Sequence, residues 1–537
     1  MRRRSTLSLI AAGALAALLA GCAPATSDAG ASATDGEPVP GGTLVFGDVQ
    51  PITTAQTQRA NNYSVANLLS QLEDRLTFID PETGELGGWI AEEFSANDDN
   101  TEFTFVIRDA VTFSDGTPLD ADAVEQNLEF LGHGDPDQGI PANTGFSGFD
   151  RAEVTGESEV TAYFSTPNYN FLTVTSTATA GLVSPATLEL DIEGQSDVEQ
   201  IVGSGPFVFE SQIPEQEIRL TAREDYAWAP ESSPNQGRAY LDEVVFTVLA
   251  EVGLRSGAVT SGQVDVARGI QPTDEQPLRD AGFEVVPTRT TELTVNFTGL
   301  RATDTVLEDV RVRQALQIGF DRDALAENVL GESYAPATSL LPADAPGYVD
   351  LSAELAYDPE RAAELLDEAG WVVGTDGIRE KDGEPLEVSL AASNQSVVFR
   401  PAFEFIAEQW RGIGVHLDNR AGDNTYSTAA GTDPTVELLG TRLFMNGGIG
   451  PIFREDANTW TFHADEEFNA AYEAELAAAD EPAWREAREA QQRRIVIDDP
   501  RVLVLWEETQ VQALGQGVHV EFTGGDTPLL QRAWVAG

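Results

Sequence analysis

The sequence predicts a protein of the α/β class, because strand patterns and helix patterns alternate along much of the chain. Residues 386–390 alternate apolar and polar side chains, as a half-buried strand does, and residues 413–417 have a similar strand pattern. Between them, Phe403, Ile406 and Trp410 share one face of a helical pattern. Strands separated by helices usually pair in parallel, so we expect a largely parallel sheet here.

The beginning of the folded region shows the same two kinds of pattern. Gly41 and Gly42 predict a turn before a short strand at residues 43–46. A polar loop at residues 50–62 follows, and the apolar residues of 65–72 then recur with helical spacing. We therefore expect a strand, a loop and a helix in this order.

The next strand and helix are predicted from alternation and from capping residues. Apolar Phe103, Phe105 and Ile107 alternate with residues of the opposite face, which predicts a strand with one buried side. Asp120 is a typical helix N-cap, and the helix is expected to end at Gly132.

Later helices carry similar signals. Asp309, Asp321 and Asp358 are each expected to cap a helix, and Pro359 follows the last of them at a position where a missing N–H costs nothing. The acidic, alanine-rich stretch 465–494 predicts one or two amphipathic helices. The apolar run 502–506 predicts a short buried strand.

The composition indicates a packed globular body with a strongly acidic surface. The 537 residues are 41% hydrophobic, and the 89 acidic residues against 32 Lys and Arg give a net charge of −57. Such a surface repels phosphates and anionic headgroups, so nucleic acid is not expected as a partner. The acids are spread along the chain, which is typical of a solvated surface.

The first residues have the pattern of an export signal. Arg2, Arg3 and Arg4 precede an apolar run at residues 7–20, which is too short for a transmembrane helix. The run ends at Cys22, the one cysteine of the sequence, and this arrangement resembles the lipobox of bacterial lipoproteins, which is cut before a lipidated cysteine. The alternative is an ordinary signal peptide that contains a cysteine.

The lipobox resemblance defines the first two segments. Residues 1–21 would be the lipoprotein signal peptide, and Cys22 would carry the lipid anchor. Residues 22–40 are rich in Ala, Ser, Thr, Gly, Asp and Pro and predict a flexible tether. The protein would lie outside the cytoplasm, attached to the outer face of the cell membrane or periplasmic, with the anchor as its sole membrane contact.

Several sequence blocks together resemble one known family. They are EEF (92–94), RDAVTFSDGTPLDADAV (108–124), GSGPF (203–207), YAW (226–228), YLDEVVF (240–246), SGQVDVA (261–267), VRVRQAL (310–316), YDPERA (357–362) and LLDEAGW (365–371). In this order they are similar to the peptide- and nickel-type solute-binding proteins of ABC importers, family 5. The resemblance covers most of the chain after the tether.

The resemblance implies an α/β, two-lobed fold of the periplasmic-binding-protein type, class II. Lobe 1 would combine residues 41–80, 191–290 and 505–537, with an extra subdomain at residues 81–190. Lobe 2 would span residues 291–504. The chain would cross between the lobes near residues 295–297 and 505–506, and these two segments would form a hinge.

No catalytic or metal-binding pattern is present in the sequence. A Gly-x-Ser-x-Gly turn, a phosphate-binding Gly-x-x-x-x-Gly-Lys loop and a His-Glu-x-x-His motif are all missing. The four histidines, His133, His416, His463 and His519, do not have metal-ligand spacing. Adjacent acids such as Glu92-Glu93 and Glu507-Glu508 are expected on helix faces. We therefore expect no catalytic residues, no metal and no cofactor.

A solute site usually combines aromatic walls with a few polar groups, and glycine makes the backbone accessible to the solute. The resemblance points to residues 442–448, where Asn446 stands at the position at which peptide-binding relatives have an Asp that holds the α-ammonium. A neutral amide cannot neutralise an ammonium, which weakens the expectation of a free peptide N-terminus. The candidate ligand-binding residues are Asn61, Asn62, Tyr63, Arg268, Arg442, Phe444, Asn446, Trp460 and Trp506.

Each candidate also has a structural alternative. The segment that contains Asn446 could be an ordinary glycine-containing turn, Trp460 and Trp506 could pack in the core, and Arg268 could form a surface ion pair. The function implied is an ABC-importer binding protein, a monomer that captures a peptide or similar small polar solute and delivers it to permease subunits. The alternatives are a secreted hydrolase on a similar scaffold and an exported receptor or chaperone-like protein.

Overall fold

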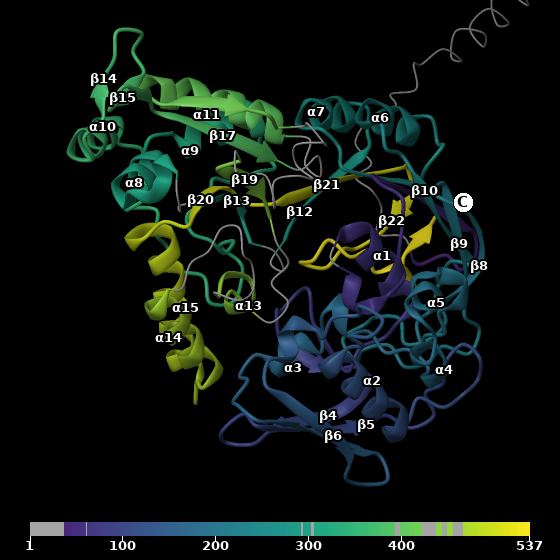
Figure 1. Ribbon diagram of the computed structural model, residues 1–537. Helices are drawn as coiled ribbons and strands as arrows, with labels where there is room; N and C mark the ends of the chain where they lie inside the picture. Colours follow the sequence, from purple (N-terminus) through teal and green to yellow (C-terminus); the bar gives the residue numbers. More distant parts are fainter. Residues whose placement is uncertain are drawn as a thin grey trace, which may run out of the picture. The chain divides into compact units, whose positions relative to one another are not determined.

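The computed structural model describes residues 37–60, 62–290, 294–301, 305–392, 398–421, 436–442, 448–454 and 465–536 (Figure 1). The chain divides into two units, residues 1–37 and 38–537, and the second unit contains the folded elements. The expected signal peptide, Cys22 and most of the expected tether lie outside the described residues.

A mixed seven-stranded sheet follows the N-terminal segment. In this sheet the order is β12-β21-β11-β1-β10-β9-β8, and β1 runs parallel to both β10 and β11. The strands are β1 (Thr43–Asp48), β8 (Phe207–Ile213), β9 (Glu217–Ala222), β10 (Glu243–Val248), β11 (Val266–Arg268), β12 (Glu284–Arg289) and β21 (Thr509–Leu514). Helix α1 (Tyr63–Leu72) shares one apolar core with this sheet, and α6 (Val252–Thr260) and α7 (Pro272–Asp280) contribute to another. The strand and the helix expected at the start of the fold are confirmed.

A second sheet has five strands in the order β18-β17-β19-β13-β20. Its strands are β13 (Asn296–Leu300), β17 (Glu387–Ala392), β18 (His416–Asn419), β19 (Leu438–Thr441) and β20 (Val502–Trp506). As expected, β17 pairs in parallel with its neighbours, and α11 (Phe399–Gly412) buries Phe403, Ile406 and Trp410 in the same core as these strands. In contrast, β13 is antiparallel to β19 and β20.

A third sheet is antiparallel, with the order β4-β5-β7-β6. It consists of β4 (Ala91–Ala96), β5 (Glu102–Ile107), β6 (Phe149–Val154) and β7 (Glu159–Phe164), and it shares a phenylalanine-rich core with α2 (Ala121–His133) and α3 (Phe171–Val174). The expected end of α2 at Gly132 is wrong, because the helix continues to His133 and Gly134 is the C-cap. Gly132 lies where a Cβ atom would overlap the ring of Phe149, so packing explains this glycine.

Capping residues were well predicted by the sequence. The side chains of Asp120, Asp309, Asp321 and Asp358 each accept a hydrogen bond from a backbone N–H of the first turn that follows. Asp309, Asp321 and Asp358 cap three helices, α8 (Val310–Ile318), α9 (Arg322–Leu325) and α10 (Pro359–Glu368), respectively. The stretch 465–494 forms two helices, α14 (Glu466–Leu476) and α15 (Glu481–Arg493), which lie side by side (Figure 1).

The remaining elements are short. They are β2 (Thr77–Ile79), β3 (Leu86–Gly88), β14 (Val372–Val373), β15 (Arg379–Lys381), β16 (Glu384–Pro385), β22 (Val518–His519), β23 (Trp534–Val535), α4 (Pro185–Leu188), α5 (Ile192–Ser196), α13 (Gly450–Phe453), η1 (Thr57–Arg59), η2 (Thr144–Phe146), η3 (Ala178–Ala180), η4 (Val198–Gln200), η5 (Val306–Glu308), η6 (Ala326–Leu330), η7 (Arg494–Asp498) and η8 (Leu530–Arg532). In the part of the chain that the structure describes, no helix combines the length and the apolar character that crossing a bilayer requires.

The chain crosses twice between the seven-stranded and the five-stranded sheet. It passes from β12 to β13 and later returns from β20 to β21. The strands on either side of the two crossings are paired, because Arg289 is opposite Thr509 and Asn296 is opposite Trp506. The two crossings therefore begin and end next to each other.

Candidate functional site

A buried ion pair lies at the ends of two neighbouring parallel strands. Asp48 is the last residue of β1 and Arg268 the last residue of β11, and the register of the two strands places them next to each other. Nη2 of Arg268 is 2.5 Å from Oδ1 of Asp48, and the two side chains are 4% and 2% exposed. Arg268 also donates to Ser64 Oγ at 2.8 Å and to Gln510 Oε1 at 3.1 Å. The ion pair of Arg268 is thus buried and not at the surface.

The environment of Arg268 keeps it charged. Burial alone would lower the pKa of its guanidinium, but attraction to Asp48 and Asp526 outweighs this effect and raises the pKa. The guanidinium carbon lies 5.5 Å from the centre of the Tyr63 ring, close enough for a cation–π interaction. Any carboxylate of a solute would therefore compete with Asp48 for this guanidinium.

Two further candidate binding residues, Asn62 and Tyr63, lie at the N-terminus of α1. Asn62 is the N-cap, because its Oδ1 accepts from Val65 N at 3.1 Å and also from Gln50 Nε2 at 3.0 Å. Tyr63 is buried, and its ring faces a second guanidinium, that of Arg442, at 5.9 Å. The third candidate of this loop, Asn61, lies outside the described residues.

Arg442 connects the five-stranded sheet to the second crossing. It follows β19, and its Nε lies 3.2 Å from Oε1 of Glu508, with the side chains 7% and 3% exposed. Oε2 of Glu508 accepts a hydrogen bond from Asn296 Nδ2 at 2.6 Å. We call Asp48, Tyr63, Arg268, Asn296, Arg442 and Glu508 the crossing cluster, because it joins residues of both sheets where the chain passes between them.

The surroundings of the crossing cluster contain buried polar atoms without a hydrogen-bond partner among the described residues. They include Oδ2 of Asp48, both side-chain amide atoms of Asn67, Oε1 of Gln512 and Oδ2 of Asp526. Burial raises the pKa of Asp526 well above its usual value, and the attraction of Arg268 only partly offsets this. Most buried polar groups in proteins are paired, so this concentration of unpaired polar atoms marks a place with unused binding capacity.

Trp506 ends β20 inside the apolar core of the five-stranded sheet. Its ring centre is 5.4 Å from that of Phe399, and the residue is fully buried. Its Nε1 has no hydrogen-bond partner among the described residues. Of the remaining candidates, Phe444, Asn446 and Trp460 lie outside the residues that the structure describes.

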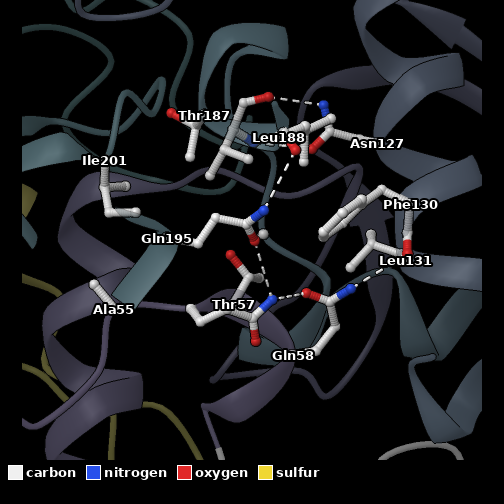
Figure 2. A pocket seen from close by; sticks show the side chains of 13 residues that line it. Ala55, Thr57, Gln58, Asn127, Phe130, Leu131, Thr187, Leu188, Gln195 and Ile201 are labelled. Carbon is white, nitrogen blue, oxygen red and sulfur yellow. Dashed lines mark hydrogen bonds between the residues drawn. The ribbon is translucent and has the colours of Figure 1, made fainter. Parts of the chain in front are cut away.

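The cavity drawn in Figure 2 is not a solute site. It has a volume of about 10 Å³, which is room for a single water molecule. Gln56 lines it, and its Nε2 donates to Gln58 and, at 3.5 Å, to Gln195. Oε1 of Gln56 is buried without a partner among the described residues, so a water molecule would satisfy it.

The structure corrects our interpretation of two acid pairs. Glu92 and Glu93 belong to strand β4, and Glu507 and Glu508 lie in the second crossing, so none is on a helix. The crossing pair is buried at 3% and 2% exposure, and Oε1 of Glu507 accepts from Ala343 N at 2.9 Å. The useful signal was their position directly after the apolar run 502–506, where a chain leaves a buried strand.

Groups of three or more His, Cys, Asp or Glu side chains that could hold a metal ion are not found among the described residues. The crossing cluster offers carboxylates, guanidiniums and amides instead. These groups bind polar and charged solutes through hydrogen bonds and ion pairs.

Comparisons with known proteins agree on one family. Residues 85–470 match the model of the bacterial extracellular solute-binding proteins, family 5. The glutathione-binding protein GsiB of Escherichia coli K12 is 23% identical over 82% of this chain and 78% of its own. The oligopeptide-binding protein AppA of Bacillus subtilis is 26% identical over 78% of this chain and 76% of its own.

Solved structures show the same fold. The complex of Bacillus subtilis AppA with a nonapeptide superposes with a TM-score of 0.78 and 20% identity, covering 93% of this chain and 100% of AppA. NikA from Brucella suis in complex with Fe(III)-EDTA has a TM-score of 0.76 and 20% identity, covering 92% of this chain and 100% of NikA. The expected α/β fold of the periplasmic-binding-protein type is thereby confirmed.

Proposed function

The chain belongs to the bacterial extracellular solute-binding proteins of family 5, and from this premise we propose that it captures a peptide or a similar small polar solute for an ABC importer. Binding would take place without chemical change of the solute. The protein would then deliver the solute to the permease subunits, as a monomer.

The observation that carries the proposed mechanism is the pair of adjacent crossings between two sheets. We assign residues 41–80, 191–290 and 505–537 to lobe 1, residues 81–190 to its extra subdomain, and residues 291–504 to lobe 2. Each lobe would move as a unit about the crossings and close on the solute. Two paired connections support such a hinge because only a few residues have to change their backbone angles.

The solute site is proposed where the crossing cluster meets both lobes. Tyr63, Arg268 and Arg442 would contact the solute or hold the residues that do so, and the unpaired donors and acceptors beside them would bind its polar groups. Asn61, Asn62, Phe444, Asn446, Trp460 and Trp506 remain proposed contacts. Glutathione and oligopeptides, the solutes in the names of GsiB and AppA, are the first compounds to test.

Attachment to the membrane is a separate part of the proposal. Cys22 follows an apolar run and basic residues at the start of the sequence, which supports export and lipidation at this position. Two or more acyl chains would hold the protein at the membrane essentially permanently, since each buried CH₂ contributes about 0.8 kcal/mol. The Cys22→Ser variant should be released into the medium, and retention at the membrane would contradict this part.

Titration calorimetry tests the binding function directly. Purified protein should bind at least one member of a panel of glutathione, dipeptides and longer peptides, and small-angle X-ray scattering should show compaction on binding. Mass spectrometry should recover the solute unchanged. No binding and no compaction across the panel would contradict the proposal, and cleaved peptide would favour a hydrolase.

A further inference from the structure

A second polar contact joins distant parts of the chain, away from the two crossings. Asn170 is the N-cap of α3 in the region of the antiparallel sheet, and it contacts residues of α14 and α15. Its Nδ2 donates to Oε1 of Glu475 at 2.8 Å, and its Oδ1 accepts from Nε1 of Trp484 at 2.8 Å. One amide thus uses its donor and its acceptor on two different helices.

The partners of Asn170 are held in place by their own helices. Oε1 of Glu475 also accepts from Nε of Arg488 at 2.8 Å, and Oε2 accepts from Gln491 Nε2 at 2.6 Å. The guanidinium carbon of Arg488 lies 4.5 Å from the centre of the Trp484 ring. Glu475 is fully buried, yet it keeps an ion pair and an amide donor even without Asn170. The contacts of Glu475 with Arg488 and Gln491 therefore hold the receiving surface together within α14 and α15.

Further contacts extend the same interface beyond Asn170. Tyr169 N donates to Leu476 O at 3.2 Å, and Asn100 Nδ2 donates to Ala478 O at 2.9 Å. The rings of Tyr169 and Trp484 are 5.8 Å apart. Two turns of one region thus reach the end of α14, so the contact does not depend on a single side chain.

We propose that Asn170, Glu475, Trp484 and Arg488 form a latch that stabilises the closed form of the protein. This inference rests on the proposed hinge, because residues 81–190 and 291–504 would move relative to each other. The latch is suited to opening, since its groups are polar and Glu475 keeps Arg488 and Gln491 as partners when Asn170 leaves. Asn170 and Trp484 Nε1 would then bind water at low cost.

A substitution in the latch should affect solute binding differently from a substitution in the solute site. If the latch only sets the closed fraction, weakening it lowers the apparent affinity for every solute by the same factor. A residue that touches the solute would change the affinities unequally. For Asn170→Ala we expect a loss of about tenfold, which corresponds to about 1.4 kcal/mol.

The experiment compares the wild type with four variants. Asn170→Ala removes the hydrogen bonds to Glu475 and Trp484, Trp484→Phe removes one donor, and Asn170→Asp places a carboxylate against Glu475. Asn143→Ala is the matched control, because Asn143 is a buried cap whose partners, Gly145 and Thr179, lie in the same region of the chain. Calorimetry uses glutathione, the dipeptide Met-Leu and a nonapeptide mixture, and scattering measures compaction.

If the latch exists, each variant should lose affinity by the same factor for every solute that binds. The loss should be largest for Asn170→Asp, smaller for Asn170→Ala and smallest for Trp484→Phe. Asn143→Ala should bind like the wild type. The Asn170→Asp variant should also be expanded without solute, and it should become more compact when the pH is lowered and its carboxylate is protonated. Wild-type affinity in Asn170→Ala and Trp484→Phe, or losses that differ between solutes, would overturn the inference.

Failure of the proposed function gives a different result. If the wild type binds no solute, the binding proposal fails, while scattering of the solute-free variants still reports on the latch. If the wild type binds and closes but the latch variants behave like it, only the latch is wrong.

Discussion

The crossing cluster and the latch are both buried and polar, but they differ in how completely their groups are paired. In the latch, both oxygens of Glu475 have hydrogen-bond donors, and the amide of Asn170 is used at both ends. Beside it, Gln491 keeps one atom, Oε1, without a partner among the described residues. Around the crossing cluster, Asp48, Asp526 and Asn67 keep atoms without a partner among the described residues. A contact between two parts of one protein can be complete in itself. A site that accepts a third molecule needs capacity that the protein leaves unused.

The largest expected effect is the loss of stability when the arginine of each cluster's buried ion pair is replaced. Arg268→Met leaves Asp48 buried with only Ser64 and a backbone N–H as donors, so we expect the free energy of unfolding to fall by about 3–5 kcal/mol. Arg488→Met should cost less, about 1–3 kcal/mol, because Glu475 keeps two amide donors. Urea unfolding followed by tryptophan fluorescence measures both.

The exposed Arg151 provides the control for these substitutions. It pairs with Asp150 and Glu153 at the surface, and Arg151→Met should not change the midpoint measurably. Equal losses for Arg268→Met and Arg488→Met would remove the energetic difference between the two clusters.

The second prediction concerns pH. Burial raises the pKa of Asp526 in the folded protein, so the folded state holds a proton that the unfolded chain releases near pH 4. The contribution of this group to stability is therefore full below about pH 4 and is lost as the pH rises toward the folded pKa, at up to about 1.4 kcal/mol per pH unit. Asp526→Asn should remove this slope.

Thermal unfolding of Asp526→Asn and wild type between pH 4 and pH 8 tests this effect. As the pH rises, the melting temperature of the wild type should fall relative to that of Asp526→Asn. The exposed Asp150→Asn serves as the matched acid-to-amide control and should follow the wild type. Parallel curves for Asp526→Asn and wild type would show that Asp526 does not carry the pH dependence.

The third and smallest prediction concerns a glycine beside the latch. Gly448 has φ = +123°, and a Cβ atom there would lie 2.9 Å from Nη2 of Arg488 and 3.1 Å from Oε1 of Glu475. Gly448→Ala should destabilise the protein by about 1–2 kcal/mol through backbone strain and displacement of Arg488. Gly377→Ala is a matched control, because Gly377 has φ = +89° and no atom within 4 Å of a Cβ.

Calorimetric unfolding separates the two contributions in these variants. The strain alone appears in Gly377→Ala, and the excess in Gly448→Ala measures the close approach to the latch. If the two glycine variants lose the same stability, the latch tolerates displacement and its geometry is less tightly defined than the hydrogen bonds imply.

Local features were predicted well from the sequence. The caps Asp309, Asp321 and Asp358 could be recognised because a capping side chain bonds to a backbone N–H only two or three residues away. The strand at 502–506 was visible as a short apolar run. The family resemblance then supplied the order in which these elements assemble.

The buried polar contacts could not be predicted in the same way. Asn170 and Glu475 are 305 residues apart, and neither has a neighbour in the sequence that indicates the contact. The pair Glu507-Glu508 gives no distinct signal in the sequence, because adjacent acids are common in a chain with 89 of them. Gly132 resembles a helix end in the sequence, but the structure shows that the ring of Phe149 leaves no room for a Cβ there, and this contact depends on tertiary packing.

The two crossings differ in length. Between the paired residues Arg289 and Asn296 the chain has six residues, 290–295, whereas only Glu507 and Glu508 separate Trp506 from Thr509. A two-residue connection can extend by only about 7 Å, so it would act as the pivot of the proposed rotation while the longer connection takes up the change in path. Groups attached to the pivot, Glu508 above all, would stay nearly still as the solute enters.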